Sequence, residues 1–420
     1  MRRKNLLLVI GALLIVSIVC VATIYLLSRE DNSADQTDLL QPEGTHMVLH
    51  LSTYTLPYGK QPIPCSLFLF YDANGTVIKQ HKVDEEVVGD FVVQTDTANH
   101  FFFKNQTVVA TSDSQLYTTK SDISISSTNF GPSQTGYIED LDVAYALLNV
   151  GTQKGQYINV LRFSSSSTVY DVVLPCYLDH ISYDTIQRRF ICVISPLNAG
   201  FDSSAISYVS VSYDEENDRF LLEEDIRRIQ DDTYSWETTL YRFSMVKNGK
   251  LYMSILNTKP EQNCGDLFLK VYDINRGSLL ATESLLTNYD LGELGHGLMS
   301  GSSAFPMCVR NEKLYVFTST GQFFVVDDED KIAKCDMPFP FEDALSVFTP
   351  NEVPEESRNS FFGSRVQVLE NGTILVLNIY EDGKVIVYRW GAGMYEPIFE
   401  CFLPENLPTT VIINSFYFAS

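Results

Sequence analysis

The sequence predicts an all-β protein built from repeated four-stranded units arranged in a ring, and two recurring hairpin patterns carry this prediction. The first pattern consists of apolar residues, a polar turn and an alternating aromatic and aliphatic run. It occurs at Phe243–Asn257, Pro306–Thr320 and Val366–Tyr380, with turn asparagines Asn248, Asn311 and Asn371. Consecutive turn asparagines are 63 and 60 residues apart. A fixed period of strand–turn–strand units is typical of a repeat array.

The second pattern is a hairpin with an acidic turn, and it alternates with the first. Its copies are Ser66–Val83, Asp266–Leu285 and Gln322–Pro338, with looser copies at Ser207–Glu224 and Val385–Phe402. Turn residues such as Asp-x-Asn-Gly between alternating apolar runs favour hairpins. The two hairpins together give four strands per unit. Leu221–Asp232 is the one stretch whose pattern also fits a helix.

The hairpins divide the chain into a first unit, 46–84, and six further units. We place the six at 90–138, 139–180, 181–235, 236–300, 301–360 and 361–404. The first unit has three strands and lacks the opening strand of the others, while Val411–Ser420 is a terminal strand without a partner in sequence. Pairing these two closes a ring and leaves no exposed sheet edge. Residues 45–420 are therefore predicted to form a β-propeller of about seven four-stranded blades, closed by the C-terminal strand.

The acidic turns also carry a resemblance to a known superfamily. Tyr272, Asp273 and Gly277, together with Tyr71 and Asp72, resemble turns of the irregular bacterial β-propellers, the PQQ-repeat-like and surface-antigen-type groups. The tryptophan docking signature of PQQ repeats is missing, since the chain has 2 tryptophans, and so are the Gly-His and Trp-Asp pairs of WD40 repeats. The resemblance therefore implies a fold and no activity.

The first residues predict a membrane anchor. Arg2, Arg3 and Lys4 precede residues 6–27, which are apolar or small and uncharged. About 20 such residues span a bilayer as a helix. Basic residues before this segment and acidic residues after it place 1–5 in the cytoplasm and the rest outside. We expect a single-pass signal-anchor in the plasma membrane and a flexible stalk at 28–44. A cleaved signal peptide and a lipoprotein attached at Cys20 are the alternatives.

Composition excludes several classes of function. A net charge of −23, without a Lys/Arg cluster beyond the N-terminus, argues against a nucleic-acid partner. A hydrophobic share of 45% is enough for a large core. The seven cysteines after Cys20 contain no C-x-x-C pair, so a zinc site is not expected, and one disulfide stays open.

Acidic turns at Asp72, Asp214 and Asp327 superficially resemble calcium loops. They lack the alternating ligand spacing and the distant glutamate of such loops, so we interpret them as hairpin turns. Asn74, Asn105 and Asn371 fit the N-glycosylation pattern, which matters only in a pathway that glycosylates. No metal or cofactor is expected.

Ligand-binding residues are predicted in the connections that precede opening strands. His296 and Ser300 lie in a Gly- and Ser-rich connection, and Trp236 and Arg358 occupy equivalent connections. An aromatic ring, an arginine and a histidine on one face suit an anionic or sugar-like ligand. The alternative is an ordinary irregular loop. The other five histidines lie in or beside strand patterns and are expected to be structural or at the surface. No catalytic residue is predicted, because no Gly-x-Ser-x-Gly motif occurs.

These expectations favour a binding or scaffolding module at the cell surface, held to the membrane by the N-terminal helix, with an unknown protein or glycan partner. A strongly acidic surface favours cationic partners. The alternative is a propeller-type hydrolase or lyase that acts on envelope carbohydrate. An enzyme is the less expected of the two.

Overall fold

The computed structural model divides the chain into two compact units, 1–41 and 42–420. The structure describes residues 41–419, apart from 56–62, 84–91, 96, 104, 112–114, 121–122, 124–131, 154–155, 196–204, 236–238, 292–296, 300–306, 319–321, 337–346, 349–362, 370, 392 and 408–409. The predicted anchor, 6–27, and most of the predicted stalk lie outside these residues. Within the described part of the chain, no helix is both long and apolar enough to cross a membrane.

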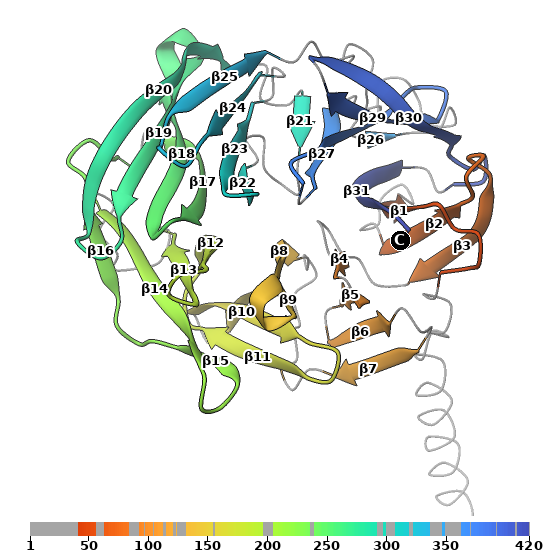
Figure 1. Ribbon diagram of the computed structural model, residues 1–420, viewed down its shortest axis with the longest axis horizontal. Helices are drawn as coiled ribbons and strands as arrows, with labels where there is room; N and C mark the ends of the chain where they lie inside the picture. Colours follow the sequence, from red (N-terminus) through yellow and green to blue (C-terminus); the bar gives the residue numbers. More distant parts are fainter. Residues whose placement is uncertain are drawn as a thin grey trace, which may run out of the picture. The chain divides into compact units, whose positions relative to one another are not determined.

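The second unit is all β, and its small sheets are arranged in a propeller-like ring (Figure 1). Six sheets occur among the described residues, and five of them have four or five strands. Two 3-10 helices, Glu139–Leu141 and Pro260–Gln262, are the helical segments of the described residues. The predicted fold class is thus confirmed at this level, and the predicted count of about seven blades stays a prediction.

Three sheets are built from the first half of the chain and the C-terminus. The first contains, in order, β26 (Val347–Phe348), β31 (Thr410–Phe418), β1 (Met47–Thr55), β2 (Ile63–Tyr71) and β3 (Val77–Val83). The second contains β4 (Val92–Gln94), β5 (Ala98–Phe102), β6 (Gln106–Thr111) and β7 (Leu116–Lys120). The third contains β8 (Pro132–Ile138), β9 (Val143–Gln153), β10 (Gln156–Ser164) and β11 (Val169–Leu174).

The largest sheet has nine strands and contains two antiparallel runs. One is β12 (Leu178–Asp184), β13 (Arg189–Ile194), β14 (Ala205–Asp214) and β15 (Arg219–Leu222). The other is β17 (Thr239–Lys247), β18 (Lys250–Lys259), β19 (Cys264–Asp273) and β20 (Ser278–Asp290). They are joined by β16 (Arg227–Gln230), which pairs with β14 and, through Gln230 and Ser278, in parallel with β20.

Two sheets follow. One contains β22 (Met307–Arg310), β23 (Lys313–Phe317), β24 (Gln322–Val326) and β25 (Ile332–Asp336). The other contains β21 (Gly297–Met299), β27 (Gly363–Val368), β28 (Ile374–Ile379), β29 (Lys384–Gly391) and β30 (Met394–Phe402). In each sheet the first strand of the antiparallel run lies near the middle of the ring and the last lies outside (Figure 1).

The C-terminal strand pairs with the first unit, as the sequence predicts. β31 is antiparallel to β1 from Met47 opposite Phe418 to Tyr54 opposite Thr410. The first unit supplies the three strands β1, β2 and β3, and β31 supplies the inner strand that it lacks. The two ends of the ring are thereby held in one sheet.

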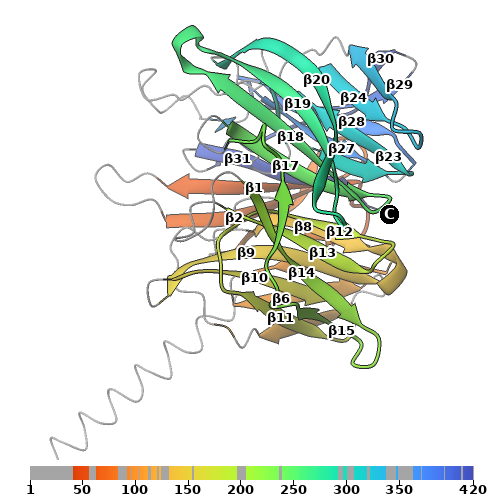
Figure 2. The same cartoon turned by 90° about the vertical axis from the view of Figure 1, so that its left-hand side faces the viewer.

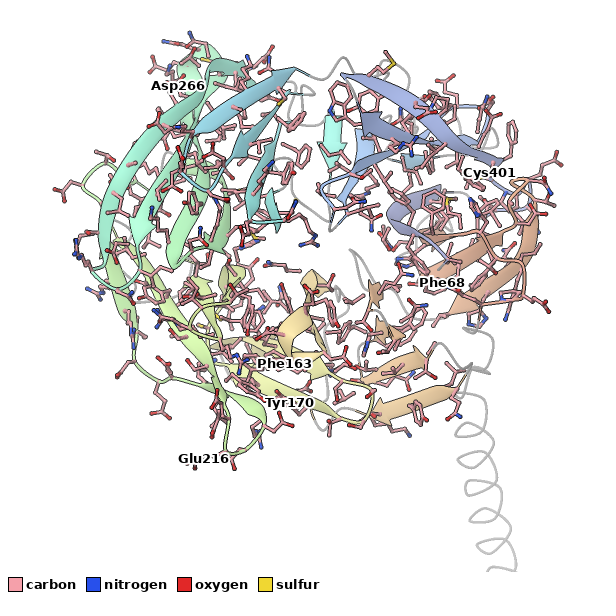
Figure 3. All side chains as sticks on the ribbon, viewed as in Figure 1. Phe68, Phe163, Tyr170, Glu216, Asp266 and Cys401 are labelled. Carbon is pink, nitrogen blue, oxygen red and sulfur yellow. The ribbon has the colours of Figure 1, made fainter. Side chains whose placement is uncertain are left out.

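The core consists of apolar clusters between neighbouring sheets. Leu49 and Leu69 of the first sheet pack with Leu377, Val385 and Phe399 of the last. Between β8–β11 and β12–β15, stacked aromatic rings fill the space, and Phe163 lies 4.4 Å from Phe220 and 5.2 Å from Tyr170 between ring centroids (Figure 3). Burial of aromatic and branched side chains on both faces of a sheet explains the sequence's strand-rich pattern.

The first predicted hairpin pattern is confirmed, with one difference. Asn248 and Asn311 lie in two-residue turns with left-handed φ of 51° and 48°. The third turn is longer, because Leu369 bonds through its backbone with Thr373, and Asn371 Oδ1 accepts the Thr373 amide at 2.9 Å. Asparagine thus adopts a left-handed conformation in the two short turns, whereas in the third turn its side chain accepts a backbone amide.

Leu221–Asp232, the stretch whose pattern also fits a helix, contains strand residues instead. Its start belongs to β15, and β16 occupies Arg227–Gln230 with Ile229 fully buried between exposed neighbours. Pairing of β16 with β14 satisfies backbone groups that a helix would satisfy internally. Tertiary pairing therefore overrides local propensity here. Seen from the side, β14 and β15 extend as one hairpin (Figure 2).

Candidate functional site

The four predicted ligand-binding residues, Trp236, His296, Ser300 and Arg358, lie outside the described residues. Their described neighbours show where two connections attach. Gly297, which follows His296, is the first residue of β21 and pairs with Gly363 of β27. On the other connection, Thr239 Oγ1 donates to the Ser235 carbonyl at 2.7 Å. The binding role of these four residues stays a prediction.

Three inner strands share a bulge at their second residue. The pairing register shifts between Pro132 and Gln134 in β8, between Leu178 and His180 in β12, and between Thr239 and Tyr241 in β17. Bulges are common beside functional sites, because they re-aim a side chain and end regular pairing. The bulged positions lie at the second residue of each inner strand, where the preceding connection joins it.

The strands β21 and β26 lie at the innermost ends of two neighbouring sheets. β21 pairs in parallel with Gly363–Arg365 of β27, and β26 pairs antiparallel with Val411 and Ile412 of β31. We call the side of β27 and β31 with which these two short strands pair the inner edge. Because strand edges present N–H and C=O groups, the inner edge can bind backbone.

A polar cluster lies at the seam between β27 and β31. Arg365 Nε donates to the Ile413 carbonyl at 2.8 Å, and Arg365 is 7% exposed. Asn414 Nδ2 donates to Ser52 Oγ and to His50 Nε2, the latter at 3.3 Å. Burial and the nearby Arg365 charge lower the pKa of His50 well below its usual range, so its ring is neutral and accepts this bond.

Two further histidines contact serines, His100 across a sheet boundary and His180 between the two strand runs of the nine-stranded sheet. His100 Nδ1 lies 2.9 Å from Ser164 Oγ, and His180 Nδ1 lies 3.0 Å from Ser244 Oγ. These pairs superficially resemble the base and nucleophile of a hydrolase. All four side chains are buried, and burial lowers the pKa of His100 to about 4 and that of His180 to about 3. His100 joins two sheets and His180 joins two strand runs of one sheet, so both have a structural role.

Other polar side chains also join neighbouring sheets, and the sequence analysis did not identify them. The Gln134 amide bonds the backbone N–H and C=O of Ile181, at 3.0 and 2.6 Å, as a strand would. Buried Arg162 pairs with Asp171 at 2.7 Å and donates to the Phe103 carbonyl of the next sheet at 2.7 Å. A charge inside an apolar strand pattern, as in Leu161–Phe163, is a signal that could have indicated Arg162.

The acidic turns are hairpin turns, as the sequence predicts. Oδ1 of Asp72 accepts the amides of Asn74 and Thr76, both at 2.9 Å, and Oδ1 of Asp327 accepts those of Glu329 and Lys331 at 2.9 Å. These backbone bonds lower the pKa of the fully exposed Asp72 carboxyl. Among the described residues, no group of three His, Cys, Asp or Glu side chains has the arrangement of a metal site.

Comparison with known proteins gives a likeness of fold alone. No family model matches the chain, and no curated protein matches it. Among solved structures, apo AztD from Citrobacter koseri is 12% identical, covers 88% of this chain and 99% of its own, and has a TM-score of 0.39. A streptogramin B lyase is 8% identical, with coverages of 90% and 100% and a TM-score of 0.38. The periplasmic gluconolactonase PpgL of Pseudomonas aeruginosa is 10% identical, with coverages of 84% and 82% and a TM-score of 0.39.

Proposed function

We propose that the protein is a binding or scaffolding module outside the plasma membrane, held there by the predicted helix at 6–27. The observation that carries this proposal is that buried polar side chains form hydrogen bonds between neighbouring parts of the ring. His100, Arg162 and Gln134 each bond from one sheet to its neighbour, and His180 bonds from one strand run of the nine-stranded sheet to the other. Buried, satisfied polar networks fix one arrangement of packed elements. A rigid ring with variable loops at its ends suits recognition of a partner.

The proposal includes a ring of seven blades. Five sheets each supply one blade, and the nine-stranded sheet supplies two, β12–β15 and β17–β20, which β16 links through Gln230 and Ser278. This division agrees in number with the seven units of the hairpin pattern, although β8 (Pro132–Ile138), which falls in the predicted unit 90–138, pairs with β9 of the following unit. Class averages of the full-length chain by electron cryomicroscopy should show seven radial densities around the axis, and six would overturn this count.

Location and orientation are tested on cells that carry the full-length chain with a C-terminal epitope. We expect the chain to remain in membranes after carbonate extraction, and protease added to intact spheroplasts to remove the epitope. Recovery in the soluble fraction, or an epitope protected until lysis, would overturn the anchored arrangement.

Binding is tested by cross-linking in intact cells. The matched control is an Ile413→Asp variant, in which the ring closure is broken. A partner of the folded ring is captured by the wild-type chain and lost with the variant.

The alternative, a hydrolase or lyase acting on envelope carbohydrate, rests on His296 and Arg358, which lie outside the described residues. Within the described part of the chain, the two His–Ser pairs are buried and offer no accessible base and nucleophile. Purified full-length chain incubated with cell-envelope polysaccharide distinguishes the two functions. New reducing ends or unsaturated products that disappear with His296→Ala would favour the enzyme, and unchanged polymer favours the binding module.

A further inference from the structure

The ring-closing strand β31 is irregular near its middle. Its register with β1 places Ser415 opposite His50, and the next pair is Ile413 opposite Leu51. Asn414 lies between the two pairs and is therefore the extra residue of a β-bulge. Because a bulge interrupts the ladder of backbone hydrogen bonds, β31 is held less firmly by strand pairing here than along the rest of its length.

Polar side chains join the strands at this bulge. Asn414 Nδ2 donates to Ser52 Oγ and, at 3.3 Å, to His50 Nε2, both on β1. Beside the bulge, the Ile413 carbonyl accepts Arg365 Nε of β27 at 2.8 Å. All of these side chains are buried. We call Asn414, His50, Ser52 and Arg365 the closure cluster. Its bonds are formed away from water, where each one contributes most and where a lost partner is most costly.

One member of the closure cluster gains a charge in mild acid. His50 accepts the Asn414 amide only while Nε2 carries no proton, because a protonated imidazole is a donor at both nitrogens. Protonation would therefore set two donors against each other. Burial, and then the positive charge of Arg365, hold the pKa of His50 well below its usual range. The closed ring thus excludes a proton from this side chain.

The surroundings of the His50 ring offer nothing to balance a positive charge. Phe68 of β2 stacks on the ring with centroids 5.0 Å apart, and Phe101 of β5 contacts Phe68 at 5.7 Å. His81 of β3 lies opposite Phe68, and Arg365 reaches the cluster from β27. Both are either neutral or cationic, so neither stabilises a proton on His50.

From this geometry we propose that ring closure is an acid-sensitive switch, in which the closure cluster holds β31 on β1 and β27 at neutral pH and releases it in acid. Opening brings His50 into water, where its pKa returns to about 6.5. Above that pH the open and closed states are both neutral, and closure is unaffected. Below it the open state binds a proton that the closed state excludes, so opening becomes more favourable as the pH falls. This inference goes beyond the proposed binding function and does not depend on it.

Hydrogen exchange of the full-length chain, followed by mass spectrometry at about pH 7 and about pH 5, tests the switch. Protection factors are compared, because they divide out the effect of pH on the exchange chemistry itself. One added proton should raise the opening constant of the β31 amides about 25-fold between the two pH values. Residues 251–255 of β18, on the other side of the ring (Figure 1), report global unfolding and should exchange more slowly than β31 at both. Equal protection of β31 and β18 would overturn the proposal, because β31 would then open only with the whole ring.

The variant His50→Gln identifies the group that binds the proton. Glutamine keeps an acceptor for the Asn414 amide and does not titrate, so protection of β31 should change by less than about threefold between the two pH values. The matched control is His100→Gln, which removes another buried histidine that bonds to Ser164 between two other sheets. This control should keep the full acid effect at β31. An undiminished acid effect in His50→Gln would overturn the proposal.

A second variant and the wild type cover the case in which His50→Gln does not fold. Asn414→Asp places a carboxylate against the ring, where it accepts a bond from protonated His50. Acid should then leave exchange of β31 unchanged or slow it, and acceleration equal to that of the wild type would overturn the proposal. In the wild type alone, the opening constant of β31 should rise about tenfold for each pH unit below about pH 6. A constant value over this range would also overturn the proposal.

Discussion

Lys270 Nζ lies 2.6 Å from Asp231 Oδ2, and the two side chains are 3% and 1% exposed. Asp231 follows β16, whereas Lys270 is on β19, so this ion pair fixes the connection between two strand runs onto the second of them. The Tyr272 hydroxyl donates to the same carboxylate oxygen at 2.9 Å, and Lys270 also donates to Thr233 at 2.8 Å. Burial raises the pKa of Asp231, but bonds from Lys270, Thr233 and Tyr272 outweigh it and hold that pKa below its usual value.

Replacing Lys270 by methionine should lower the free energy of unfolding by about 3 kcal/mol or more, because it leaves a buried carboxylate without its cation. The matched control is Lys259→Met, which breaks the Lys259–Asp266 pair, 39% and 19% exposed at 2.7 Å. That pair is partly exposed to water, and we expect a loss of at most about 1 kcal/mol. Urea denaturation followed by tryptophan fluorescence measures both. Equal losses in the two variants would contradict a special role for the buried pair.

The buried histidines should make the ring sensitive to acid. In the folded chain burial lowers the pKa of His180 to about 3 and that of His100 to about 4, with the Asp142 charge opposing burial at His100. The unfolded chain has the ordinary value, about 6.5. Above that pH both states are neutral and stability is unaffected. Below it the unfolded state binds protons that the folded state does not, so stability falls as the pH falls from about 6.5 toward the folded values.

Each histidine contributes a slope of up to about 1.4 kcal/mol per pH unit in this range. His180→Gln removes one titrating group, so the stability gap between wild type and variant should shrink by about 2 kcal/mol between pH 7 and pH 5. Denaturation curves at the two pH values measure this gap. Parallel pH profiles of wild type and His180→Gln would contradict the prediction.

Ring closure should depend on the core contacts of β31. Ile413 is 1% exposed and packs with β1 and with β28–β30. Ile413→Ala should therefore cost about 3 kcal/mol, through lost burial and the cavity left behind. Met394→Ala on the outer strand β30, where the side chain is 64% exposed, should change stability by no more than about 0.5 kcal/mol. Thermal unfolding measures both, and a similar small effect in the two variants would show that β31 does not hold the ring closed.

The sequence was sufficient for the fold because its strands are marked twice, by alternation and by turn residues. Asn248 and Asn311 fit left-handed turns, and Asp72, Asp273 and Asp327 accept backbone amides in their own turns. Alternation and turn residues are local features, so they can be recognised in a single sequence. The pairing of the terminal strand followed from counting strands, since the first unit lacks one.

Contacts between sheets could not be predicted in the same way. The bonds from Gln134 to Ile181 and from Arg365 to Ile413 join residues 47 and 48 positions apart, and no local pattern links them. The pairing of β21 with β27 and of β26 with β31 depends on the path of the connections in space, which no local pattern indicates. The predicted binding residues His296, Ser300 and Arg358 belong to these same connections, and Trp236 belongs to the one before β17, so the sequence could indicate the segments and not the geometry of a site.

Two glycines in hairpin turns differ in how closely the turn contacts a neighbouring sheet. Gly75 and Gly249 both have left-handed φ, +76° and +71°. A Cβ on Gly75 would lie 2.2 Å from the Glu400 carbonyl oxygen of β30, whereas a Cβ on Gly249 would meet nothing within 4 Å. Gly249→Ala should therefore cost about 1 kcal/mol, which is the backbone term alone.

Gly75→Ala should cost about 3 kcal/mol or more, because the turn of the first sheet must move away from β30. That movement also weakens the bond from the Tyr71 hydroxyl to the Phe402 carbonyl, 3.1 Å in the wild type. Denaturation measures the difference between the two variants, and hydrogen exchange at Cys401 and Phe402 should rise in Gly75→Ala alone. Equal costs for both glycines would mean that the turn yields without disturbing β30, and that the contact does not help to hold the first and last sheets together.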